Sequence, residues 1–165
     1  MPYPLTTTLS RIKAANPCPD GWARALDAAG KAEADEDLIL FSEIINAVEI
    51  EDALWCCRAE PQHSREWRLF AIWCARQVQH LMTDQRSLDA LDIAERYANG
   101  LATDKDLDAA RAAARDVACA ARDVAWCAAW DVACGGPWCA ACDDARDAQR
   151  NAFMQLCTDG TLPTT

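Results

Sequence analysis

The chain has 165 residues, 52% of them apolar, and its 26 acidic against 16 basic side chains give a formal net charge of −10. This length predicts one domain with a substantial hydrophobic core. So acidic a chain lacks the basic face that binding to nucleic-acid phosphates requires. This argues against direct nucleic-acid binding. The charge is compatible with a basic protein as a partner, including one that normally holds nucleic acid, and with a role in solubility alone.

The beginning of the chain has no apolar region typical of a signal peptide, and no apolar run approaches the roughly 18 residues of a transmembrane helix. We therefore expect a cytoplasmic protein without membrane association. In that compartment the ten cysteines should be reduced thiols that pack as small apolar side chains.

Short helices are predicted through the first half of the chain by apolar residues at helical spacing and by capping residues. Thr8 or Thr7 caps the first helix, Asp20 caps the second, and Gly30 ends the second. A strand at 38–41 would find no partner strand elsewhere, so a helix is preferred there. The expected helices cover residues 9–15, 21–29, 38–48 and 49–58.

Two longer helices are predicted in the middle of the chain. Ser64 begins the first, which runs to about Met82, and Ser87 caps the second. The Asn-Gly pair at 99–100 is typical of a helix C-terminus and ends the second helix. Every connection is short, so helices adjacent in sequence should pack together, largely antiparallel.

An alanine-rich helix over about 104–134 is the central element that the sequence predicts. Thr103 is its N-cap, and Asp106 stands at the third helical position, as in a capping box. Charged residues collect on one narrow face, and the rest of the surface is largely apolar, so neighbouring helices must bury it. The helix should end at the Gly-Gly-Pro of 135–137, and a last helix follows over 138–157.

These elements predict an all-α fold, a bundle of about seven to eight helices that includes the long central Ala-rich helix. We expect a single helical domain over 1–165. Within it, 1–19 is an N-terminal arm with a short helix, and 158–165 is a flexible tail.

Cysteine and histidine motifs give weak indications of chemistry. The sequence WCAAC at 138–142 looks like the Trp-Cys-x-x-Cys motif of thiol–disulfide oxidoreductases, but no β-strand is predicted before it. Two sets of residues could offer ligands to zinc, although neither has the paired spacing of a structural site. The sets are Cys127, Cys134, Cys139 and Cys142, and Cys56, Cys57, His63, Cys74 and His80. We predict no metal, no cofactor and, without a catalytic triad or phosphate loop, no enzymatic activity.

Two surfaces are the candidate partner-binding sites. The first is the acidic stretch 84–108, in which seven carboxylates stand against three basic side chains. The second is a face of the central helix on which Trp126 and Trp130 lie one turn apart, and which could support a homodimer. The acidic candidates are Asp84, Asp89, Asp92, Glu95, Asp104, Asp106 and Asp108.

Three segments carry a resemblance to a known family. They are DALWC at 52–56, RLFAIWCARQVQHLMTD at 68–84 and AERYANGLATD at 94–104, followed by an Ala/Arg/Trp-rich helix. Over about 22–153 the chain resembles a family of uncharacterised all-helical phage and prophage proteins, some of them labelled immunity proteins of the Imm-5-like kind. The resemblance implies a helical fold and a phage origin, and it carries over no site residue.

The first functional hypothesis is a phage-type binding protein that inhibits a bacterial defence factor in the host cytoplasm. Its partner would be a bacterial protein or ribonucleoprotein complex, such as a CRISPR–Cas or other nucleic-acid-targeting complex, and it would act by occluding a protein surface. Three alternatives stay open. They are an immunity protein that neutralises a cognate toxin, a structural self-associating bundle, and a Cys-based redox or zinc protein.

Overall fold

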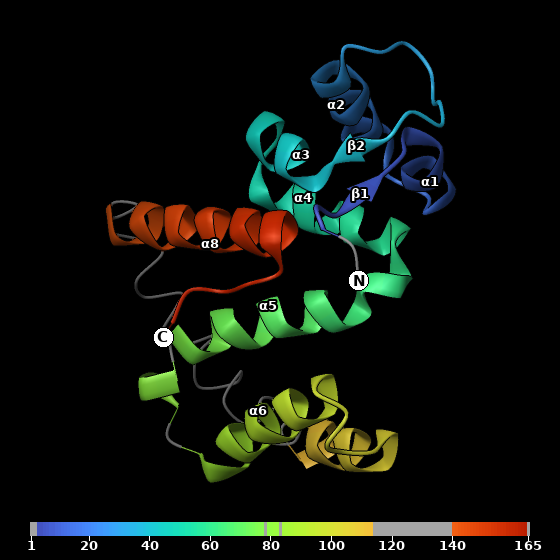
Figure 1. The fold of residues 1–165 in the computed structure, drawn as a ribbon. Coiled ribbons are helices and arrows are strands. Elements are labelled where there is room, and N and C mark those ends of the chain that lie inside the picture. The colour runs from blue at the N-terminus through green and yellow to red at the C-terminus, as the bar shows by residue number, and fades with distance from the viewer. Residues whose placement is uncertain (1–2, 78, 83, 114–139, 165) are drawn as a thin grey trace. The chain divides into compact units, whose positions relative to one another are not determined.

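A computed structural model describes residues 3–77, 79–82, 84–113 and 140–164 (Figure 1). The chain divides into two compact units. Unit 1 comprises Met1–Phe70 and Arg146–Thr164, and unit 2 comprises Ala71–Ala145 with Thr165. The boundaries fall inside two helices, so each unit contains part of both. That the whole chain forms a single domain stays a prediction.

Helices make up nearly all of the regular structure in the described residues, which confirms the all-α prediction. The helices are α1 (Leu9–Ala14), α2 (Pro19–Ala29), α3 (Phe41–Ala47), α4 (Ile50–Cys56), α5 (Ser64–Gln77), α6 (Gln85–Ala98) and α8 (Ala140–Asp159), with short 3-10 helices η1 (Cys57–Ala59), η2 (Pro61–His63) and η3 (Gln79–Leu81). Residues 104–113 are also helical and begin the predicted central helix, whose continuation to 134 lies outside the described residues.

One pair of strands departs from the sequence expectation. β1 (Thr6–Thr7) pairs antiparallel with β2 (Ile39–Leu40), with Thr6 opposite Leu40. The segment before α3 therefore does have a strand partner, and α3 begins at Phe41. The expectation was wrong because strands of two residues are too short to show an alternation of apolar and polar positions.

Capping residues set the ends of several helices as predicted. At the start of α1, Thr8 Oγ1 accepts a hydrogen bond from the Arg11 amide at 3.2 Å. Gly30 ends α2 in the left-handed region, with φ 65°. Asn99 is the C-cap of α6, and Gly100 follows it with φ 72°.

Two predicted N-caps are wrong. Cys18 rather than Asp20 caps α2, because Pro19 occupies the first helical position, where its missing N–H and fixed φ are suited. Asp84 rather than Ser87 caps α6, so that helix begins earlier than expected.

Aromatic rings form the centre of the core of unit 1. Phe41 of α3, Trp67 and Phe70 of α5 and Phe153 of α8 are in contact, with ring centroids 5.0–6.4 Å apart. Phe41 and Phe153 are fully buried. Phe153 contacts all three other rings, so a residue near the C-terminus closes a core formed by the first half of the chain.

The N-terminal arm and the tail after α8 are both fastened in unit 1. The Leu5 amide donates to the Cys157 carbonyl at 2.8 Å. Gly160 has φ 81°, a left-handed conformation that favours glycine, and a Cβ at this position would overlap the Tyr3 ring unless that side chain shifted. In the predicted flexible tail, the Thr161 amide and hydroxyl donate to Asp159 Oδ1 at 2.9 and 2.7 Å.

Among the described residues of unit 2, the buried ones come from α5, α6 and the helical residues 104–113. They are Ile72, Trp73, Ala98, Leu107 and Ala110. Leu107 and Ala110 lie on the predicted apolar face, whereas Asp108 and Arg111 are exposed, which confirms the first part of that pattern. In the part of the chain that the structure describes, no helix combines the length and apolar character needed to cross a membrane.

Candidate functional site

The seven carboxylates predicted to bind a partner lie on one helical hairpin of unit 2, residues 84–113, which we call the acidic hairpin. Asp84 caps α6, Asp89, Asp92 and Glu95 lie on α6, and Asp104, Asp106 and Asp108 lie on the helical residues 104–113. All are exposed except Asp84, which is half-buried.

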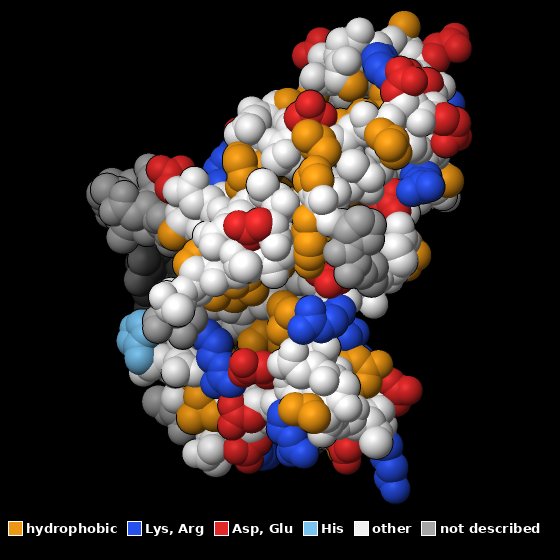
Figure 2. All heavy atoms as spheres, in the orientation of Figure 1, with side chains coloured by type: hydrophobic (Ala, Val, Ile, Leu, Met, Phe, Trp, Pro, Cys, Tyr) orange, Lys and Arg blue, Asp and Glu red, His pale blue; other side chains and the backbone are white. Residues whose placement is uncertain are grey.

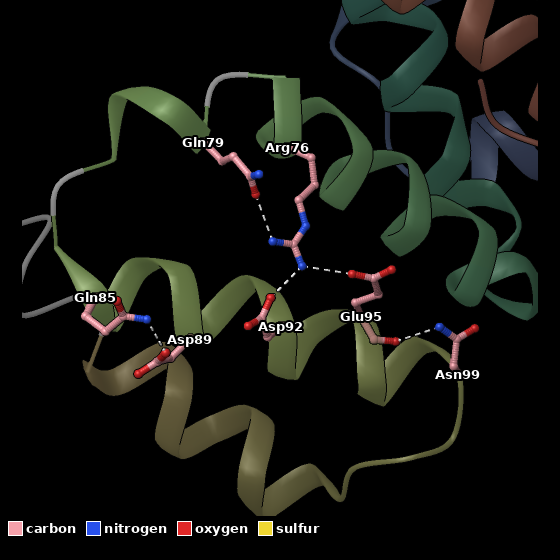
Figure 3. A network of polar contacts seen from close by, with 7 residues as sticks. All are labelled: Arg76, Gln79, Gln85, Asp89, Asp92, Glu95 and Asn99. Atoms are coloured by element: carbon pink, nitrogen blue, oxygen red, sulfur yellow. Dashed lines mark hydrogen bonds and ion pairs between the residues drawn. The ribbon is translucent and has the colours of Figure 1, made fainter. Parts of the chain in front are cut away.

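Arg76 of α5 holds two of these carboxylates in place (Figure 3). Its Nη2 lies 2.6 Å from Asp92 Oδ1 and 2.9 Å from Glu95 Oε2, and its Nη1 donates to Gln79 Oε1 at 2.9 Å. The hydrogen bonds to Asp92 and then Glu95 raise the pKa of Arg76. The guanidinium therefore stays charged, and charge-assisted hydrogen bonds fix both carboxylates.

At the start of the acidic hairpin, local partners hold the carboxylates. Asp84 Oδ1 accepts from the Arg86 amide at 2.9 Å, and its Oδ2 lies 3.0 Å from Arg86 Nη2. The Arg86 side chain, and then its amide, lowers the pKa of Asp84. One turn into α6, Gln85 Nε2 donates to Asp89 Oδ1 at 2.8 Å.

The turn of the acidic hairpin is a Schellman motif. The Gly100 amide donates to the Tyr97 carbonyl at 3.0 Å, and the Leu101 amide donates to the Arg96 carbonyl at 2.7 Å. Across the turn, the Tyr97 hydroxyl donates to Asp104 Oδ1 at 2.5 Å. The two helices are thus joined by a turn of defined geometry.

The predicted capping box at the second helix of the hairpin is confirmed. Asp106 Oδ2 accepts from the Thr103 amide at 2.9 Å and from its hydroxyl at 2.7 Å, and the Asp106 amide donates to Thr103 Oγ1 at 3.3 Å. The Thr103 amide contributes most to the lowered pKa of Asp106. Asp108, further along, forms an exposed ion pair with Arg111 at 3.8 Å.

Each of the seven carboxylates therefore has a partner within the chain. On the face shown in Figure 2, acidic side chains lie over α6 with basic side chains interspersed among them. The acidic hairpin is thus a mixed surface with an excess of negative charge, whose carboxylates have defined positions. Sequence could not show this, because Arg76 is 16 residues from Asp92 and 19 from Glu95.

Leu101 is an exposed apolar side chain in the turn of the acidic hairpin, and it was not among the residues predicted to bind a partner. It is 67% exposed. It occupies the position of the Schellman motif whose apolar side chain usually packs back on the helix. Here the residue that it would pack on is Arg96. The sequence offers only one signal for an exposed Leu101. It places a charged residue, Arg96, at the helix position on which this leucine would otherwise pack.

The second predicted surface cannot be placed, because Trp126 and Trp130 lie outside the described residues. So do residues 138–139 of the WCAAC sequence and the side chains of the first cysteine set. Among the described residues, no three His, Cys, Asp or Glu side chains are grouped so that they could hold a metal ion. The second set, from Cys56 to His80, is therefore not brought together as a ligand cluster.

Buried thiols lie in the core of unit 1 rather than at a reactive surface. Burial raises the pKa of Cys56 to about 11 and that of Cys157 to about 12, and it also raises the pKa of Cys57. A raised pKa keeps these groups as thiols at neutral pH, which suits a packing role. Cys18, by contrast, is exposed.

Two buried carboxylates were not expected from the sequence. Glu60 is 1% exposed and accepts from Arg11 Nη1 at 3.0 and 3.2 Å, and its carbonyl accepts from Trp67 Nε1 at 3.1 Å. Glu66 is 3% exposed, and its Oε1 accepts from the Tyr3 hydroxyl at 3.5 Å. These contacts connect the N-terminal arm and α1 to the start of α5, which is a structural role.

The chain matches no known family model, no curated protein and no solved structure. The resemblance to phage and prophage proteins therefore stays a prediction.

Proposed function

We propose that this chain is a phage-type binding protein, without enzymatic activity, that inhibits a bacterial defence factor in the host cytoplasm. The acidic hairpin would dock on a basic protein surface and occlude it. The first candidate partner is a nucleic-acid-targeting complex such as a CRISPR–Cas ribonucleoprotein, because such complexes carry basic surfaces that normally hold nucleic acid.

The observation that carries the proposal is the exposed Leu101 in the turn, flanked along the hairpin by Glu95 and Asp104. Protein interfaces commonly place an apolar anchor at the centre and charged residues at the rim. Leu101 is 67% exposed and would enter an apolar pocket of the partner, while the carboxylates would meet basic residues around that pocket. The negative excess would speed association with a basic partner.

The intramolecular partners of the carboxylates favour this kind of recognition. A carboxylate already held by Arg76 or by a helix cap loses little conformational freedom when a partner binds. The interspersed basic side chains also favour a protein surface with charges of both signs over the uniform phosphate row that a mimic of nucleic acid would need. Binding should weaken as salt is added, because part of it is electrostatic.

The experiment is a pull-down from the bacterial host with the full chain and two matched variants. Leu101→Ser removes the proposed anchor, and Leu38→Ser removes a leucine of unit 1 that is exposed to a similar degree, 70%. We expect wild type and Leu38→Ser to retain a defence complex. Leu101→Ser should bind that complex with about 30-fold lower affinity, which is the effect of losing a hot-spot residue that contributes about 2 kcal/mol. Phage plating on the defended host should follow the same order.

Three results would contradict the proposal. Equal retention by both leucine variants would show that the acidic hairpin is not the binding surface. Capture of a toxin encoded beside this gene, in place of a defence complex, would make the chain an immunity protein. Absence of any retained protein together with absence of phage protection would leave the self-associating bundle as the better interpretation.

A further inference from the structure

A pocket of about 550 Å³ lies in unit 1 beneath α2, on a different part of the molecule from the acidic hairpin. Its walls come from α1, α2, α3 and α4 and from the segment before β2. Pockets that bind small molecules in proteins have volumes of about 300–1,000 Å³. Nothing in the proposed function uses this pocket.

Small side chains on α2 are the reason that the pocket is not filled. Gly21, Ala25, Ala28 and Ala29 line it from one face of α2. Larger side chains line the opposite walls, among them Ile12 of α1, Ile44 of α3 and Trp55 of α4. Protein interiors are normally close-packed. The apolar side chains that line this space therefore lack the van der Waals contacts that they would have in a filled core.

Polar contacts help to hold α2 over the pocket. No residue of α2 is fully buried. Arg24 Nε and Nη2 donate to the two carboxylate oxygens of Asp52 on α4, at 2.7 and 2.9 Å. Just past α2, Lys31 Nζ lies 2.5 Å from Asp35 and 2.7 Å from Asp37. The helix can therefore keep its position whether or not the space beneath it is filled.

The charges around the pocket select against an anion. The charged side chains that line it are Lys31, Asp37, Glu43 and Asp52. Lys31 is already paired with Asp35 and Asp37, and Asp52 is paired with Arg24. Glu43 Oε2 accepts from the Leu40 amide at 2.9 Å. A ligand would thus meet apolar walls and carboxylates that already have donors, and a negative charge on it would be repelled.

From this geometry we propose that the pocket beneath α2 binds an uncharged, largely apolar small molecule. Its body lies against Ile12, Ile44 and Trp55, and Ala25 forms the ceiling. The proposal is independent of the acidic hairpin, which belongs to unit 2, so either can fail without the other.

The test is a fluorescence titration of the full chain with two related dyes. N-phenyl-1-naphthylamine is uncharged, and 8-anilinonaphthalene-1-sulfonate has the same two ring systems with an added sulfonate. We expect saturable binding of one uncharged dye per chain, and binding of the sulfonate that is weaker by about tenfold, because the rim carboxylates repel it. Absence of saturable binding, or tighter binding of the sulfonate, would overturn the proposal.

Two phenylalanine variants on α2 locate the bound dye. Ala25→Phe places a ring in the pocket, whereas Ala23→Phe adds the same ring at an exposed position outside the lining. Ala25→Phe should lower the affinity by about tenfold or more, because its ring takes the space that the dye needs. Ala23→Phe should bind as wild type does. Equal affinities in the two variants would place the dye elsewhere and reject the site.

A readout on the wild-type chain keeps the test valid if a variant misfolds. Cys18 is exposed and is one of the residues that line the pocket, so bound dye should slow its alkylation by iodoacetamide. An unchanged alkylation rate at saturating dye would count against the site. A wild-type dimer that becomes monomeric in Ala25→Phe would show that a second copy of the chain occupies the pocket, which would also overturn the small-molecule proposal.

Discussion

Replacing Phe153 by Ala should strongly destabilise unit 1, because this ring joins the C-terminal segment to the rest of the core. Phe153 is 0% exposed and contacts Phe41, Trp67 and Phe70 at 6.4, 5.8 and 5.1 Å between ring centroids. Buried Phe→Ala substitutions cost about 3–5 kcal/mol. Because Phe153 contacts three other rings, we expect the loss of stability in Phe153→Ala to lie in the middle of that range or above it.

The assay is urea unfolding followed by far-UV circular dichroism and tryptophan emission. With a slope of about 2 kcal/mol per molar urea, a loss of 4 kcal/mol moves the unfolding midpoint down by about 2 M. Phe153→Leu is the matched control, and it should cost less than about 1.5 kcal/mol because it keeps most of the apolar volume. A midpoint that moves equally in both variants, or by less than about 0.5 M in Phe153→Ala, would refute the described core.

Three further predictions test local features. Arg76→Met should lower the free energy of unfolding by about 1 kcal/mol or less, because its partners Asp92 and Glu95 are 61% and 49% exposed. A larger loss in thermal melts would show that this network contributes to the stability of the fold as well as positioning surface carboxylates. Cys18 should react with iodoacetamide at pH 8 well before Cys56 and Cys157, because burial raises the pKa values of those two thiols to about 11 and 12. Peptide mass spectrometry measures the labelling, and comparable rates at the three cysteines would contradict the burial of Cys56 and Cys157. The pKa of Asp106 is lowered in the folded chain, so the unfolded chain binds a proton at this carboxylate more readily, and the stabilisation by the cap is present at neutral pH and is lost as pH falls below about 4. Asp106→Asn should therefore lose less stability than wild type between pH 5 and 2, and an equal loss in the two proteins would disprove the linkage.

Local chemistry explains which parts of the fold could be predicted from the sequence. The Thr103–Asp106 capping box, the Gly30 stop and the Asn99-Gly100 end of α6 each depend on a few adjacent residues, and each is present. Their geometry follows from hydrogen bonds between neighbours in the chain, so composition at a few positions is sufficient to predict them.

Contacts between distant residues explain what the sequence could not predict. β1 and β2 are more than thirty residues apart and two residues long. The seven carboxylates of the acidic hairpin could be picked out from the sequence as one acidic stretch, but the pairing of two of them with Arg76 depends on how α5 packs on α6. The burial of Glu60 in a segment rich in polar residues, and the space left beneath α2, depend in the same way on which distant side chains meet.

The contacts of Phe153 also have a consequence for synthesis on the ribosome. Unit 1 is assembled from residues up to Phe70 and from Arg146 onward, so its aromatic core cannot close until about 75 intervening residues and the segment around Phe153 have been made. At about 5–20 residues per second, the first seventy residues wait roughly 4–15 s for their partner. During that interval Phe41, Trp67 and Phe70 lack the Phe153 ring that packs against all three, and this apolar surface is open to chaperones.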